Sequence, residues 1–241
     1  MRLTDFKALS FDCYGTLIDW ESGMVAALAP LTSKVKPALT RNQILEAHAR
    51  HESEQQRVTP GKLYRDLLPV VYKRLAEEWG VPASVDDCEA YGQSVRNWPA
   101  FADSPGSLQY LKKYYKLIIL SNVDNRTFSH SNARLQVEFD AIYSAEDIGT
   151  YKPADQNFTY MFDHLPNIGI KKSELLHVAE SLFHDHKPAN RHGLANCWIY
   201  RRYEQEGFGA TMDPGGRPKV DFQFHSMSDL VKAHQETLRQ Q

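Results

Sequence analysis

The hydrophobic positions of the chain form short apolar segments that alternate with longer amphipathic ones. Amphipathic helical patterns lie at 105–114, 154–165 and 186–194, and a final helix is expected at 227–240. Short apolar strands that alternate with helices predict an α/β fold with a parallel sheet covered on both faces. The segments expected to form strands are 7–14, 116–121, 141–144, 175–180, 197–202 and 221–226.

A long interval separates the first expected strand from the second. It is too long for a simple crossover connection, and its hydrophobic pattern is helical at 40–56, at about 61–80 and at 86–98. We therefore predict a helical cap inserted after the first strand. The predicted domains are a core of residues 1–17 and 99–241 and a cap of residues 18–98.

Composition narrows the class of partner. The chain has 241 residues, 42% hydrophobic and 24% charged, as in an ordinary globular protein, and a net charge of −2. This charge offers no basic field for nucleic acid or an anionic membrane surface. Three cysteines form no even disulfide framework, and no secretory or membrane-spanning pattern is found. We expect a cytoplasmic protein that acts on a small molecule, without a nucleic-acid or membrane partner.

Polar residues follow the expected strands at the points where the strands end. In a doubly wound sheet these ends meet at one edge, and ligands bind there. A single Asp or Lys at such a position is usually a turn or cap residue, but several in successive loops predict one shared pocket. The candidate side chains are Asp12, Ser121, Asn122, Lys152, Glu180 and Asp185.

Four ordered motifs make this set more specific, because together they resemble those of the haloacid dehalogenase superfamily. The resemblance covers nearly the whole chain and implies a Rossmann-like core, with the cap inserted where this family places its smaller one. It also implies that Asp12 is a covalent nucleophile, that Lys152 keeps it ionised, and that Asp185 is catalytic. The motifs are FDCYGTLIDW at 11–20, SN at 121–122, YKP at 151–153 and AESLFHD at 179–185.

Tyr14 bears on the type of reaction. Phosphatases of this superfamily typically carry a second Asp two residues after the nucleophile, where it protonates the departing alkoxide. Here that residue is Tyr14. A halide is the anion of a strong acid and leaves without a proton. The position therefore favours cleavage of a carbon–halogen bond.

The cap sequence TRNQILEAH resembles a helix of L-2-haloacid dehalogenases. The resemblance implies that Arg41 receives the halide, while Leu45 forms part of an apolar wall. Ser121 and Asn122 would hold the substrate carboxylate. The expected reaction converts a short 2-haloalkanoic acid to the 2-hydroxy acid through an ester on Asp12, with no cofactor. The resemblance is also compatible with a homodimer.

Two positions depart from the dehalogenase pattern. Phe158 stands where those enzymes tend to carry Tyr, and Glu180 stands where Ser is usual. Glu180 would either act with Asp185 on the hydrolytic water or complete a carboxylate set for Mg²⁺ with Asp12 and Asp185. The second case would make the protein a magnesium-dependent phosphatase of a small metabolite, which is the alternative function.

Overall fold

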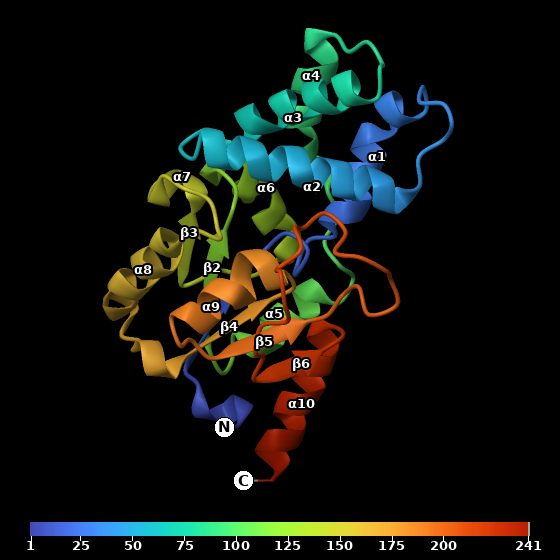
Figure 1. Ribbon diagram of the computed structural model, residues 1–241. Coiled ribbons are helices and arrows are strands. Elements are labelled where there is room, and N and C mark those ends of the chain that lie inside the picture. The colour runs from blue at the N-terminus through green and yellow to red at the C-terminus, as the bar shows by residue number, and fades with distance from the viewer. Residues whose placement is uncertain (241) are drawn as a thin grey trace.

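A computed structural model describes residues 1–240 and contains a six-stranded parallel sheet with helices on both faces (Figure 1). The strand order is β3-β2-β1-β4-β5-β6, and every neighbouring pair is parallel. The predicted α/β class and Rossmann-like core are confirmed. The strands are β1 (Ala8–Phe11), β2 (Lys116–Ser121), β3 (Ala141–Ser144), β4 (Leu175–Ala179), β5 (Asn196–Ile199) and β6 (Phe222–Phe224).

Alternation along the strands explains why both faces are covered. Successive side chains point to opposite faces. Leu9 and Phe11 therefore join one apolar cluster, and Ala8 joins another. The first cluster includes residues of α5, α6 and α10, and the second includes residues of α8 and α9. The helices of the sheet layers are α5 (Ser104–Leu111), α6 (Asn125–Leu135), α7 (Ala145–Ile148), α8 (Asp155–His164), α9 (Lys187–Arg191) and α10 (Met227–Arg239).

The topology places the end of β1 at the centre of the ligand-binding edge. β1 pairs with β2 on one side and with β4 on the other, so the strand order reverses at β1. The crevice beyond the carboxyl ends of the strands at such a reversal is where open α/β sheets bind ligands. β1 ends at Phe11, earlier than the expected 7–14, so Asp12 is the first residue of the loop that follows.

Four helices between β1 and β2 form a layer over the carboxyl ends of the strands (Figure 1). The sequence pattern anticipates α2, α3 and α4 but not α1. We call this layer the cap; the domain bounds 18–98, 1–17 and 99–241 remain a prediction. No helix among residues 1–240 is long and apolar enough to cross a membrane. The cap helices are α1 (Trp20–Thr32), α2 (Arg41–Val58), α3 (Tyr64–Glu78) and α4 (Val85–Gly92).

Candidate active site

The loop after β1 holds Asp12 through a side-chain contact within its own turn. The Thr16 hydroxyl donates to Asp12 Oδ2 at 2.8 Å and accepts the backbone N–H of Glu180 at 2.9 Å. Gly15 has φ +95°, a left-handed conformation, and a Cβ there would lie 3.0 Å from Trp20 Nε1. The tight turn thus directs the carboxylate of Asp12 toward the carboxyl edge of the sheet.

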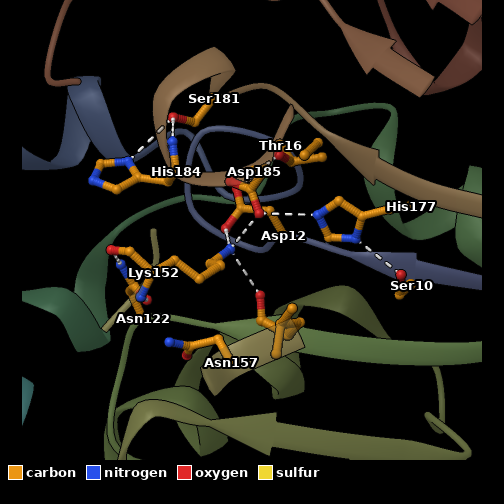
Figure 2. A network of polar contacts seen from close by, with 12 residues as sticks. Ser10, Asp12, Thr16, Asn122, Lys152, Asn157, His177, Ser181, His184 and Asp185 are labelled. Carbon is orange, nitrogen blue, oxygen red and sulfur yellow. Dashed lines mark hydrogen bonds and ion pairs between the residues drawn. The ribbon is translucent and has the colours of Figure 1, made fainter. Parts of the chain in front are cut away.

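Lys152 places its ammonium between two carboxylates (Figure 2). Its Nζ lies 2.9 Å from Asp12 Oδ1, 2.6 Å from Asp185 Oδ1 and 2.9 Å from the carbonyl oxygen of Leu120. Asn122 fixes the Lys152 backbone, because its Oδ1 accepts the Lys152 N–H and its Nδ2 donates to the Lys152 carbonyl oxygen. The three acceptors within 2.9 Å of Nζ account for all three ammonium protons.

Asp185 lies in a one-turn π-helix, η5 (Leu182–His186), which is separated from the end of β4 by two residues. Its Oδ1 accepts from Lys152 and lies 3.0 Å from His177 Nε2. Its Oδ2 is buried and has no hydrogen-bond partner among residues 1–240. A buried carboxylate oxygen without a donor is costly, so this atom is a candidate contact for water or a ligand in the cavity.

Burial and the neighbouring charges shift the pKa values of Asp12, Lys152 and Asp185 in different directions. Burial raises the pKa of Asp12 above its ordinary value, against the opposing effect of the Lys152 ammonium. Burial would also raise the pKa of Asp185, but Lys152 and the contact with His177 outweigh it and lower this pKa well below its usual range. Burial tends to lower the pKa of Lys152, but the two carboxylates raise it overall. Lys152 is therefore the fixed cation of the site, and Asp12 is the carboxylate that acid protonates first.

The cavity at Asp12 is small and closed by the cap. It has a volume of about 30 Å³ and includes Glu52 and Gln56 of α2 and Tyr64 of α3 in its walls. Burial raises the pKa of Glu52 to about 7. The cap therefore contributes neutral or titratable polar groups opposite Asp12. The walls from the core include Tyr14, Asn122, Val123, Lys152, Ser181, His184 and Asp185.

The aromatic ring of Tyr14 forms part of the wall of this cavity. Its hydroxyl is 2.7 Å from Ser131 Oγ, and its ring packs edge to face with Trp98 at a centroid distance of 5.9 Å. Burial raises the pKa of Tyr14 well above its ordinary value. The residue two positions after Asp12 is thus a weak acid whose hydroxyl already has a partner.

Arg41 and Glu180 lie in the wall of a second cavity, of about 110 Å³, and not in that of the first. Arg41 is at the start of α2, eleven residues before Glu52, which corresponds to about 16 Å along a helix. Its guanidinium contacts Ser22 Oγ at 3.4 Å and Glu21 Oε2 at 3.7 Å. The expected meeting of Arg41 with Asp12 is not seen in this arrangement.

Two further predicted residues also lie outside the cavity wall. Leu45 is fully buried in the hydrophobic cluster that includes the cap helices. Ser121 is buried, and its Oγ has no hydrogen-bond partner in the described part of the chain. Of the predicted residues, the structure brings five together in the wall of one cavity: Asp12, Tyr14, Asn122, Lys152 and Asp185. The substrate and halide roles assigned to individual residues remain predictions.

Burial, with the charges of Glu21, Asp12 and Asp185, raises the pKa of Glu180 to about 8. The three carboxylates proposed as an alternative magnesium site nevertheless do not line one cavity. Asp12 and Asp185 both face the Lys152 ammonium, while Glu180 faces the second cavity. Within residues 1–240, no group of three or more His, Cys, Asp or Glu side chains is placed to hold a metal ion. This arrangement does not fit the ion, and we derive no step through it.

Sequence reasoning missed Thr16, His177 and the cap residues Glu52 and Gln56. Thr16 had a signal, since it lies within the first motif, four residues after Asp12. His177 also had one, as a histidine inside an apolar strand. The orientation of Glu52 depends on how α2 packs across the sheet edge, which periodicity alone does not determine.

Comparison with known proteins agrees with this fold. The model of a family described as haloacid dehalogenase-like hydrolase matches residues 6–193. The chain belongs to this family and is a hydrolase. It is 29% identical over 200 residues to a protein named (S)-2-haloacid dehalogenase from Pseudomonas sp. (strain YL), covering 81% of this chain and 83% of that protein. It is 24% identical over 199 residues to "Putative HAD-hydrolase YfnB" of Bacillus subtilis (strain 168), covering 80% and 84%.

Solved structures share the fold over nearly the whole chain. The L-2-haloacid dehalogenase PA0810 has a TM-score of 0.75 at 19% identity, covering 97% of this chain and 99% of that one. The L-2-haloacid dehalogenase of Xanthobacter autotrophicus with covalently bound chloropropionic acid has a TM-score of 0.74 at 18% identity, covering 95% and 98%. YfnB of Bacillus subtilis bound to magnesium has a TM-score of 0.73 at 20% identity, covering 96% and 98%.

Proposed function

We propose that this hydrolase cleaves the carbon–halogen bond of a short 2-haloalkanoic acid. The carboxylate of Asp12 attacks C2 from the side opposite the halogen, and the halide leaves with the bonding electron pair. Water then attacks the carbonyl carbon of the Asp12 ester, which releases the 2-hydroxy acid and a proton and restores Asp12. This route needs an ionised Asp12, which Lys152 supports by its ion pair at 2.9 Å.

The observation that carries the proposal is the environment of Tyr14. A phosphate ester has an alkoxide leaving group that gains from a general acid, whereas a halide needs no proton. The hydroxyl of Tyr14 is engaged with Ser131, and its raised pKa makes it a poor acid. The position two residues after Asp12 is thus suited to halide departure.

The relatives support the same chemistry. The Pseudomonas relative is named as an (S)-2-haloacid dehalogenase, and the Xanthobacter structure holds chloropropionic acid covalently. For this chain we propose the corresponding ester on Asp12, with the substrate carboxylate next to Asn122 and Val123. Arg41 would receive the halide only after a shift of α2, because it lies in the wall of the second cavity.

Asp185 is the group we assign to the hydrolytic water. Its Oδ2 has no donor among residues 1–240, and the residue lies in the cavity wall with Asp12. Because its pKa is strongly lowered, Asp185 orients the water as an acceptor and passes the proton on to solvent rather than keeping it.

The size of the cavity implies that the cap moves during turnover. A volume of about 30 Å³ holds at most two or three water molecules, since one water needs about 10–15 Å³ by this measure, so even a small haloacid needs more room. The YfnB structure is described as revealing interdomain movement. We propose a comparable opening of α1–α4 here, which admits substrate and releases product.

Halide release is the direct test. Chloroacetate and L-2-chloropropionate are incubated with the protein, with EDTA or with Mg²⁺, and free chloride is measured. We expect release that is insensitive to EDTA and abolished in Asp12→Asn. The control variant Asp5→Asn removes an exposed carboxylate and should behave as wild type. A single turnover in ¹⁸O-water should label the Asp12 side chain before the product.

An aryl phosphate tests the alternative in parallel. Phosphate release that depends on Mg²⁺, without any halide release, would show that the dehalogenase proposal is wrong. It would also require Glu180 to turn from the second cavity toward Asp12.

A further inference from the structure

His177 is a fully buried histidine in the middle of β4, next to the catalytic group. It pairs in register with Ser10 on β1, so the two side chains point to the same face of the sheet. Its Nδ1 lies 2.9 Å from Ser10 Oγ, and its Nε2 lies 3.0 Å from Asp185 Oδ1 (Figure 2). Both ring nitrogens therefore have partners that hold the plane of the imidazole.

The charge state of Asp185 decides the direction of the second contact. Asp185 Oδ1 lies 2.6 Å from the Lys152 ammonium, and an ionised carboxylate only accepts hydrogen bonds. His177 Nε2 must therefore carry the proton and donate it. Two donors from two elements thus hold one oxygen of Asp185.

The consequence concerns the other oxygen. With Oδ1 fixed by Lys152 and His177, the carboxylate of Asp185 cannot rotate freely, and its Oδ2 stays as the unpartnered buried atom. We propose that His177 is a positioning residue that aims Asp185 Oδ2 at the water that hydrolyses the ester on Asp12. This inference rests on the proposed function and extends it to a residue outside the four motifs.

The surroundings of His177 support this role. Its ring packs edge to face on Phe158 at a centroid distance of 5.4 Å. Phe158 is the position where the resembled dehalogenases tend to carry Tyr, so here the aromatic neighbour offers no hydroxyl. The donor to Asp185 on this side is therefore His177 of β4.

The two steps of the reaction, formation and hydrolysis of the Asp12 ester, should depend on His177 to different degrees. Before attack, the negative charge of Asp12 helps to hold the Lys152 ammonium. Esterification removes that charge, and the contact from His177 then carries more of the restraint on Asp185. Loss of His177 should therefore slow hydrolysis of the ester more than its formation.

Two variants of similar polarity test this. His177→Gln can place an amide N–H near the position of Nε2, whereas His177→Asn places one near Nδ1, toward Ser10 and away from Asp185. Rapid quenching with L-2-chloropropionate, followed by mass spectrometry of the Asp12 peptide, measures the ester. We expect the ester to accumulate in His177→Asn, with kcat lowered about tenfold or more and single-turnover ester formation within a few-fold of wild type. His177→Gln should recover much of kcat.

Equal slowing of both steps in His177→Asn, or equal kcat in the two variants, would overturn the proposal. If His177→Asn does not fold, His177→Gln and Ser10→Ala carry the test. Ser10→Ala removes the Nδ1 contact and leaves the donor to Asp185, so it should lower kcat less than any variant without that donor. A larger loss in Ser10→Ala than in His177→Gln would contradict the assignment.

A measurement without substrate separates this inference from the proposed function. Nitrogen-15 NMR of labelled histidine should show a protonated Nε2 for His177, and its signal should shift in Asp185→Asn. Absence of that proton would overturn the positioning role. If the proton is present but no haloacid forms an ester in the wild type, the proposed function fails, and with it the assignment of the water.

Discussion

Glu52 is a carboxylic acid of the cap whose pKa lies well above its ordinary value. It is buried in the wall of the Asp12 cavity, and burial raises its pKa to about 7. Its neighbour His48 lies 3.8 Å away, but burial lowers the pKa of His48 to about 3, so that ring is neutral and gives no compensating charge. Above neutral pH the protein therefore contains a buried carboxylate that is supported by a hydrogen bond with Tyr64 but by no positive charge from His48.

This predicts a pH-dependent gain of stability in Glu52→Gln. An unfolded Glu ionises near its ordinary value of 4.5. As pH rises from there to about 7, the unfolded state loses a proton that the folded state keeps, so the folded state loses stability. Urea unfolding should show Glu52→Gln gaining up to about 3 kcal/mol over wild type at pH 8, and little at pH 4.5.

The exposed Glu54 on the same helix is the matched control. Glu54→Gln should change the free energy of unfolding by no more than about 0.5 kcal/mol at either pH. A gain in Glu52→Gln that is the same at pH 4.5 and pH 8 would contradict the assigned ionisation.

At the level of elements, the pattern of the sequence predicted the sheet well and missed three helices, α1, α6 and the one-turn α7. Most strands are apolar runs bounded by polar residues, so they can be recognised without knowing which strands they pair with. Helix α1 contains Gly23 and Pro30, which usually interrupt helices, so its sequence did not read as one. Helix α6 is mostly polar, and its buried residues, Phe128 and Leu135 among them, are too few for a clear period.

Gly23 shows why α1 tolerates a poor helix former. A Cβ at this position would lie 2.4 Å from Cγ of Trp98, a fully buried ring. We expect Gly23→Ala to destabilise the protein by about 1–3 kcal/mol, because overpacking exceeds the gain of about 1 kcal/mol in helix propensity. Urea denaturation measures the change.

Gly106→Ala supplies the control within helix α5. A Cβ at this exposed position meets nothing within 4 Å, so the substitution should stabilise by about 0.5–1 kcal/mol. Equal effects of the two substitutions would show that Trp98 moves aside and that the contact does not fix α1.

At the level of the whole molecule, the candidate site was predictable where it depends on the sheet alone. Asp12, Asn122, Lys152 and Asp185 follow the ends of different strands, and parallel topology brings such ends together. Arg41 and Glu52 belong to one long helix, and which of them faces Asp12 depends on where α2 crosses the core. That placement comes from tertiary packing, which the periodicity of a single helix does not encode.

The cap is held closed by polar contacts with the core. The Arg65 guanidinium lies 2.7 Å from Asp124 Oδ1, and the Arg65 backbone N–H donates to Asp124 Oδ2 at 3.1 Å. On the other side, Arg202 contacts Glu21 and Asn42 of the cap. Because Asp124 also accepts from Thr127, it joins the start of α3 to the start of α6.

Removing the guanidinium of Arg65 should lower kcat/KM and also the free energy of unfolding, because its partner Asp124 is buried. Arg65→Met keeps the backbone contact and the apolar stem but removes the guanidinium. We expect kcat/KM for halide release to fall a few-fold, since a smaller fraction of the protein is closed. The free energy of unfolding should fall by about 1–3 kcal/mol, because Asp124 is buried and keeps only the Arg65 backbone N–H and its contacts with Thr127. Arg50→Met is the control, because Arg50 pairs with Glu78 inside the cap and does not reach the core. If Arg50→Met reduces kcat/KM as much as Arg65→Met does, the effect comes from the stability of the cap itself, and closure onto Asp124 is not what limits turnover.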